Sequence, residues 1–237
     1  MKKIKALVLI FLFSSSTFIF AQTKKTALEI RDEALKQSDV KNSIEYIKRN
    51  IGEAQTLSDT RSLWYFTGCL EEQCGLYEDA ATSYVKAAGI GASDATGFVK
   101  VSSEQIVLCA VRSCLCAGDS ESADRYLNSA VRSSKDENVI AFVNLYSLWS
   151  SLSKALSEEE EKDSIALLNA YILMDSMKSV RPQLLLTLWY LNADTATGER
   201  LKKEYPLSPE AKIVEGKVNL AVFPFWLFTP HKTSLVE

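Results

Sequence analysis

The sequence predicts an all-α protein. No segment keeps the alternation of apolar and polar residues that is typical of a half-buried strand. Apolar residues instead recur at helical spacing, and Ala, Leu, Glu, Lys and Ser dominate the composition. Residues that favour helix N-termini stand ahead of several of these segments. The chain is therefore expected to be helical through nearly all of its folded part.

The first elements of the fold follow from local signals. Residues 25–37 predict an amphipathic helix. Ser38 or Asp39 can cap a second helix, because a short oxygen-bearing side chain accepts hydrogen bonds from the first free backbone N–H groups. The polar residues 58–60 mark the start of a third helix.

The segment 64–87 holds the most informative pattern, a helix, a tight turn and a second helix. Large and small residues alternate along it in a fixed order, namely Trp64, Gly68, Gly75, Tyr77, Ala80, Tyr84 and Ala87. The pattern resembles a tetratricopeptide (TPR) repeat. In that family small residues let the two helices approach, and aromatic residues fill the remaining space. The resemblance implies a short TPR-like solenoid of stacked antiparallel helix pairs over residues 22–220.

A loop and a second pair follow the first. Residues 89–97 predict a loop, and 102–133 predict the second pair. Aligned on its turn glycine, Gly118, this pair has Ala123 and Ala130 at the small-residue positions of its second helix. The offset between the pairs exceeds the family's repeat of about 34 residues by the length of the loop.

A third pair is expected at 136–156 and 158–179. Ser157 and Glu160 have the spacing of a capping box. The acidic run Glu158–Glu161 then occupies the first helical turn, where it suits the helix dipole better than it suits a bound cation.

The last pair is expected at 184–191 and 196–205. After it, Ser208 can cap a further helix with Pro209 in its first position. The segment 205–211 resembles the turn between repeats of periplasmic TPR proteins.

The N-terminus has the pattern of a secretory signal peptide, residues 1–21. Three lysines precede the apolar run Ala6–Phe13 and a cluster of hydroxyl residues, and Ala21 suits a cleavage site. The run is shorter than the ~20 residues of a membrane-spanning helix, which is the alternative. No cysteine lies near the cleavage point, so we expect no lipoprotein anchor. The expected location is the periplasm or the extracellular medium.

Charge and motifs exclude several functions. The net charge is −3, and cleavage would remove three lysines, which leaves 24 basic against 30 acidic residues and a charge of −6. This balance argues against nucleic acid. His231 is the only histidine, and no metal-binding or phosphate-binding motif is present. We therefore expect no catalytic residue, metal or cofactor, and no enzymatic activity.

Five cysteines lie in the first two pairs, Cys69, Cys74, Cys109, Cys114 and Cys116. Residues five apart on one helix are separated by ~7.5 Å and ~140°, so no bridge forms within a helix. Two alternatives remain. One is a disulfide between neighbouring helices, and the other is buried thiols that act as small apolar residues.

The TPR resemblance also implies a groove along the first helix of each pair, where the family binds a peptide. Its positions correspond here to Tyr65, Cys69, Glu72, Gln73, Gln105, Leu108, Arg112 and Leu115. Only Arg112 matches the basic residues of the family's carboxylate clamp, so capture of a free C-terminus is not expected. The alternative for each position is ordinary packing against the next repeat.

The C-terminal tail, residues 221–237, is unusually apolar, with Phe223, Phe225, Trp226 and Phe228 close together. Three interpretations are open. The tail can cap the last helices, occupy a groove of this chain or of a partner, or contact a membrane surface peripherally.

The sequence thus predicts a non-catalytic scaffold or adaptor of the cell envelope that binds a protein or peptide partner. The alternative is a helical binding protein for a small apolar ligand, with Trp64, Tyr65, Phe66 and Trp189 around a pocket.

Overall fold

The computed structural model describes residues 24–192, 195–218 and 223–225. Within these ranges every regular element is a helix, and the one β-type contact is an isolated parallel bridge between Lys25 and Ala54. The all-α prediction is confirmed. The predicted signal peptide, residues 1–21, lies outside the described residues.

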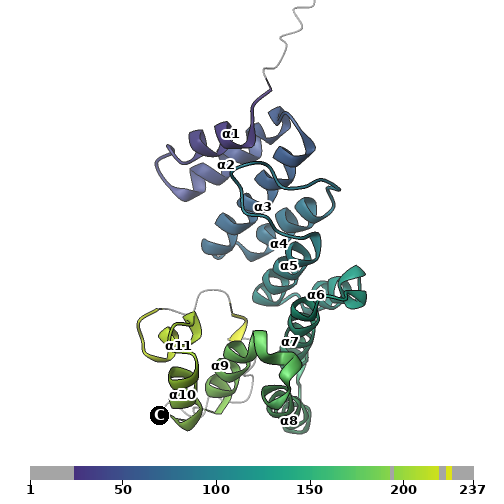
Figure 1. Cartoon of the computed structure of the whole chain (residues 1–237), viewed down its shortest axis with the longest axis vertical. Coiled ribbons are helices and arrows are strands. Elements are labelled where there is room, and N and C mark those ends of the chain that lie inside the picture. Colours follow the sequence, from purple (N-terminus) through teal and green to yellow (C-terminus); the bar gives the residue numbers. More distant parts are fainter. Residues whose placement is uncertain (1–23, 193–194, 219–222, 226–237) are drawn as a thin grey trace, which may run out of the picture.

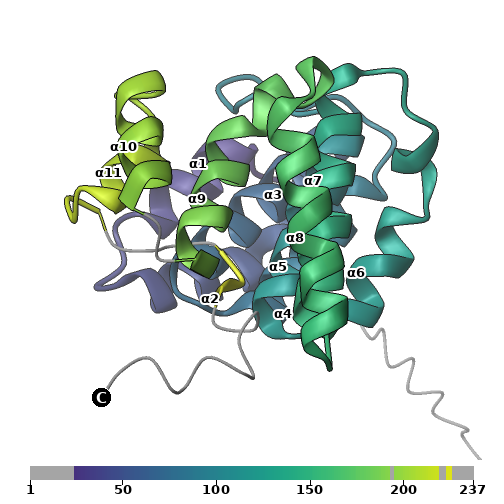
Figure 2. The same cartoon turned by 90° about the horizontal axis from the view of Figure 1, so that it is seen from below.

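The helices form a continuous series along the long axis of the molecule (Figure 1). Helices α1 to α8 follow one another from one end to the other, and α9–α11 turn back beside α7 and α8. Helices α10 and α11 lie on the opposite side from α6 (Figure 2). Their bounds are α1 Ala27–Ala34, α2 Val40–Asn50, α3 Leu57–Gln73, α4 Tyr77–Ala88, α5 Ser103–Ala117, α6 Ser120–Leu127, α7 Glu137–Lys154, α8 Glu158–Leu173, α9 Arg181–Asn192, α10 Thr195–Glu204 and α11 Pro209–Val214, with 3₁₀ helices η1 Ile51–Glu53, η2 Ala130–Ser133 and η3 Asp175–Val180.

Two helices end earlier than the sequence pattern suggested. The second helix of the second pair ends at Leu127 and is followed by the short η2. The Ser129 hydroxyl donates to the Tyr126 carbonyl at 2.6 Å and so competes with the helical hydrogen bond. Helix α8 ends at Leu173, and η3 replaces its expected last turns because Met177 and Val180 are buried in the core.

The caps agree in part with the expected ones. Ser208 caps α11, and Pro209 is its first residue. Helix α3 begins before the expected start, because Thr56 caps it and forms a reciprocal pair with Asp59. The capping box at α8 is incomplete. Glu160 accepts the N–H of Leu156 at 2.8 Å instead of that of Ser157.

The helix pair α3–α4 is held together at Gly68. A Cβ atom there would lie 2.8 Å from the ring of Tyr84, so only glycine leaves room for this side chain. Ala80, Tyr84 and Ala87 are all buried against the same neighbours. Gly75 begins the turn between the helices in a left-handed conformation, with φ of 73°.

The other predicted packing positions differ in how deeply they are buried. Trp64 is half-buried beneath Lys86, whose Nζ lies 4.0 Å from the ring centre. Tyr77 is half-exposed at the start of α4. Ala123 is fully buried in α6, whereas Ala130 begins η2 and not a helical turn of α6.

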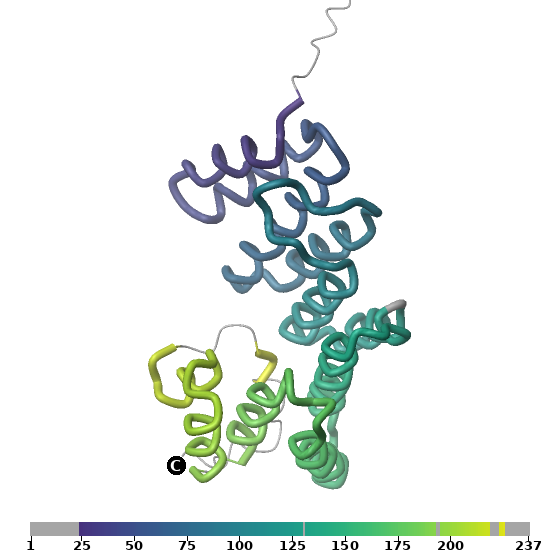
Figure 3. Tube along the Cα trace, in the orientation of Figure 1, coloured from purple at the N-terminus to yellow at the C-terminus, as the bar shows by residue number. Residues whose placement is uncertain are grey.

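Figure 3 shows the path of the loop between α4 and α5. Side-chain hydrogen bonds hold this loop to the helices beside it. Arg61 of α3 is buried, and its Nε donates to Asp94 Oδ1 at 2.9 Å. Its Nη2 donates to the Val101 carbonyl at 2.7 Å and its Nη1 to the Ala87 carbonyl at 3.2 Å. Asp94 also accepts the N–H of Val101 at 2.8 Å. One guanidinium thus joins α3 to the end of α4, to the middle of the loop and to its C-terminal end.

Candidate functional site

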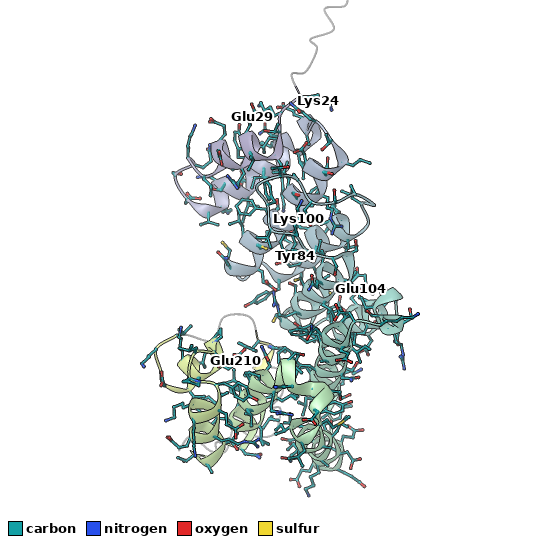
Figure 4. All side chains as sticks on the ribbon, in the orientation of Figure 1. Lys24, Glu29, Tyr84, Lys100, Glu104 and Glu210 are labelled. Carbon is teal, nitrogen blue, oxygen red and sulfur yellow. The ribbon has the colours of Figure 1, made fainter. Side chains whose placement is uncertain are left out.

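Helices α3, α4, α5 and α7 bring a set of polar and aromatic side chains together, which we call the Glu72 cluster. Seven-residue spacings place Tyr65 and Glu72 on one side of α3, and Cys109 and Cys116 on one side of α5. Tyr84 joins them near the junction of α4 and α5 (Figure 4). The members of the cluster are Tyr65, Cys69, Glu72, Tyr84, Cys109, Arg112, Ser113, Cys116 and Tyr146.

The carboxylate of Glu72 is the centre of the cluster and accepts four hydrogen bonds. Arg112 donates Nε to Oε1 at 2.9 Å and Nη2 to Oε2 at 2.6 Å. The Ser113 hydroxyl donates to Oε1 at 3.0 Å, and the Tyr84 hydroxyl donates to Oε2 at 3.1 Å. Such a two-pronged contact fixes the plane of the guanidinium as well as its position.

Arg112 keeps one amino group for other partners. Its Nη1 has no hydrogen-bond partner in the described part of the chain, and its side chain is 29% exposed. Tyr65, Cys69 and Cys109 are half-exposed nearby. The cluster therefore presents a preoriented donor on a surface with an aromatic ring and two thiols.

Burial controls the electrostatics of the cluster. Desolvation raises the pKa of Cys109 to about 11, and the Arg112 guanidinium opposes this rise. Burial also raises the pKa of Tyr84, and the negative charge of Glu72 raises it further. Burial likewise raises the pKa of Tyr146. These thiol and phenol groups are protonated at neutral pH, so the cluster favours hydrogen bonding over nucleophilic chemistry.

The predicted groove positions divide into surface and core. Tyr65, Cys69 and Arg112 reach the surface in part. Gln73 and Gln105 are exposed, and Gln105 caps α5 with Ser102. Two positions are corrected here. Leu108 and Leu115 are buried in the apolar core that α5 shares with α6 and α7, so they present no groove surface. Glu72 is also buried, so it does not face the surface itself and instead orients the Arg112 side chain.

The alternative pocket for an apolar ligand is not assembled. Trp64 and Tyr65 pack in the cluster around Tyr84, whereas Phe66 packs against Phe98 near α1. Trp189 lies in the C-terminal core beside Gly198. The four aromatic residues of that prediction therefore belong to three separate packing clusters, and this part of the alternative was wrong.

The described part of the tail packs inside the C-terminal half. Phe225 is 1% exposed and lies with its ring centre 5.9 Å from that of Trp149 on α7 and 4.8 Å from that of Tyr190 on α9. Phe223 contacts Trp149 at 5.8 Å. Trp226 and Phe228 lie outside the described residues.

All five cysteines carry free thiols in this structure. Cys74 is exposed, and Cys114 and Cys116 are buried, while Cys69 and Cys109 meet in the Glu72 cluster. No group of three or more His, Cys, Asp or Glu side chains among the described residues is arranged to hold a metal ion. No helix in the described ranges has both the length and the apolar character needed to cross a bilayer.

Sequence reasoning gave no role to Arg61 or Asp94. The two residues lie 33 positions apart and their side chains meet at 2.9 Å in the interior. The only local signal is a single basic residue in the predicted helix and a single acidic one in the predicted loop, and neither indicates the pairing.

Comparison with known proteins gives one likeness. A family model described as a middle domain matches residues 153–237, from the end of α7 to the C-terminus. No curated protein and no solved structure matches the chain. The match covers about a third of the chain and does not include the Glu72 cluster.

Proposed function

We propose that this protein is a non-catalytic protein-interaction module, a short TPR-like solenoid that serves as a scaffold or adaptor in the cell envelope. Its partner binds as a peptide segment over the Glu72 cluster. The observation that carries the proposal is Arg112, which Glu72 holds in a fixed orientation with Nη1 unpaired on a partly exposed surface.

The chemistry of this surface suits a peptide. A guanidinium whose orientation is already fixed loses little conformational freedom on binding, so more of the hydrogen-bond energy contributes to affinity. Tyr65 adds an aromatic contact of the kind that is enriched at protein interfaces. Arg112 and Glu72 compensate each other's charge, so the Nη1 group suits a backbone carbonyl as well as a carboxylate.

The solenoid part of the proposal rests on helix packing. The close approach at Gly68 and Tyr84 is the small-to-large interlock that the TPR resemblance implies. The envelope location rests on the signal-peptide pattern of residues 1–21.

Site-specific photocrosslinking in cells that export the chain tests the proposal. A photoreactive phenylalanine analogue replaces Tyr65 in one variant and the half-exposed Tyr205, which directly follows α10, in the control. We expect a crosslinked protein from position 65 and none from position 205. Arg112→Ala combined with the analogue at position 65 should reduce the yield at least fivefold. Equal crosslinking at both positions, or none at position 65, would contradict the proposal.

A further inference from the structure

A second concavity lies between α7 and the segment formed by α6 and η2. It has a volume of about 510 Å³, within the ~300–1,000 Å³ typical of ligand sites. We call it the α6–α7 trough. It extends from Arg132 and Ile140 at one end to Asp124 and Lys154 at the other. None of its lining residues belongs to the Glu72 cluster.

The dimensions of the trough favour an extended occupant. From Ile140 to Lys154 the helix α7 advances about 21 Å. The volume, distributed over this length, leaves a channel narrower than an α-helix, which is about 10–12 Å across with its side chains. An extended peptide advances about 3.3 Å per residue, so about six residues fit.

The lining combines accessible apolar side chains with amide side chains. Ile140 is exposed and Val143 is half-buried, whereas Leu127 and Val131 are buried beneath them and only close the bottom of the trough. Asn128 and Asn144 lie along the same trough. Each amide carries donors and an acceptor, which matches the N–H and C=O groups of a peptide backbone. Asn144 is available for this role, because its one partner among the described residues is Met177, whose Sδ accepts from Asn144 Nδ2 at 3.7 Å.

The charges at the two ends differ. Lys154 is paired with Asp124 at 2.5 Å, so that end is neutral. Arg132 is exposed and donates to the Asn128 amide oxygen, and no carboxylate of the described residues lies within ion-pairing distance of it. One end of the trough therefore carries an uncompensated positive charge.

We propose that the α6–α7 trough is a second binding site, which takes an extended peptide of about six residues with an acidic side chain at Arg132. Apolar side chains of the ligand next to this acid contact Ile140 and Val143, which lie at the same end of the trough. The amides of Asn128 and Asn144 bind the intervening backbone.

An array of random hexapeptides, acetylated and amidated to remove terminal charges, tests the site with the full chain lacking residues 1–21. We expect enrichment of peptides with Asp or Glu at one end and apolar residues next to it. The best peptide is then measured in solution by fluorescence anisotropy. A charge-assisted pair contributes enough binding free energy that R132E should weaken the affinity tenfold or more. The R132E variant should instead prefer the same peptide with Lys in place of its acidic residue.

Matched controls distinguish binding at this site from nonspecific binding and from binding at the Glu72 cluster. Arg125→Glu changes an exposed cation on α6 outside the trough and should alter affinity less than twofold. Asn144→Leu should weaken binding at least tenfold, and both trough variants should crosslink normally through position 65. An array without enrichment, unchanged affinity in R132E, or equally tight binding of acetylated glutamate amide alone would overturn the proposal.

Discussion

The two halves of the molecule are stabilised by different chemistry. In the N-terminal half, ion pairs with buried carboxylates join neighbouring elements: Glu72 with Arg112, Asp94 with Arg61, and the fully buried Glu71 with Lys48 at 2.6 Å. In the C-terminal half, aromatic rings meet instead. Trp149, Phe223 and Phe225 contact one another, and Phe225 also contacts Tyr190.

This contrast predicts different responses to substitution. Buried ion pairs repay their desolvation only when every partner is present, so the loss of one partner is costly. An apolar core loses stability in proportion to the contacts that are removed. We therefore expect the stability of the N-terminal half to depend on keeping both partners of each ion pair. The stability of the C-terminal half should depend on the apolar volume of its core side chains.

The largest effect is expected for Glu72→Ala. The change leaves the Arg112 guanidinium without a counter-charge and removes the acceptor of Ser113 and Tyr84. The free energy of unfolding, measured by urea denaturation, should fall by about 3–5 kcal/mol.

The double variant Glu72→Leu with Arg112→Met is the matched control, because it removes both charges and keeps the volume. It should recover most of the lost stability. An unchanged denaturation midpoint in Glu72→Ala would show that the pair is not a structural determinant of the N-terminal half.

The corresponding change in the C-terminal half is Phe225→Ala. It removes a buried ring from Trp149 and Tyr190 and should lower the free energy of unfolding by about 3 kcal/mol. Phe225→Leu should cost less than half as much, because most of the apolar volume remains. Thermal melting and the near-ultraviolet circular dichroism of the aromatic cluster measure the effect of each of these two substitutions. Melting temperatures like that of the unsubstituted protein would mean that the tail contributes nothing to this core.

Gly68→Leu should cost about 1–3 kcal/mol, because the side chain collides with the Tyr84 ring. Gly52→Leu is the control, since a Cβ at Gly52 meets no atom within 4 Å. The difference between the two melting temperatures measures the interlock of α3 and α4. Equal melting of the two variants would contradict the close approach at Gly68.

The smallest effect concerns pH and is confined to the N-terminal half, where all five cysteines lie. The folded protein keeps the protons of Cys109 and Cys114 up to about pH 11, whereas unfolded thiols lose theirs near pH 8.5. Their contribution to stability is thus complete below about pH 8.5 and is lost as the pH rises to 11.

With iodoacetamide at pH 8, the exposed Cys74 should be alkylated first. Peptide mass spectrometry would disprove this if Cys109 or Cys114 reacted as fast.

Local signals predicted the elements better than their contacts. The turn at Gly75 and the cap at Ser208 depend on a few adjacent residues, so the sequence indicated both. The end of α8 depends on Met177 and Val180, whose burial requires α7, and was misplaced. Propensity along one helix carries no information about the surface against which its neighbour packs.

The candidate site was predicted only in part for the same reason. The TPR resemblance placed Tyr65, Cys69 and Glu72 among the groove positions, and these three residues lie together in the Glu72 cluster. It did not indicate that Arg112 and Tyr84 cover the carboxylate of Glu72, because those residues come from two other helices. Burial of Glu72 is therefore a property of the assembled fold.

The contacts of Arg61 have a mechanical consequence. A connection as long as the one between α4 and α5 would ordinarily act as a hinge. Bending there would require Arg61 to release Asp94, Val101 and Ala87 inside a dry interior, where charge-assisted hydrogen bonds are strong. The hydrogen bonds of Arg61 therefore oppose bending at this connection, because they hold it to α3 and to the end of α4.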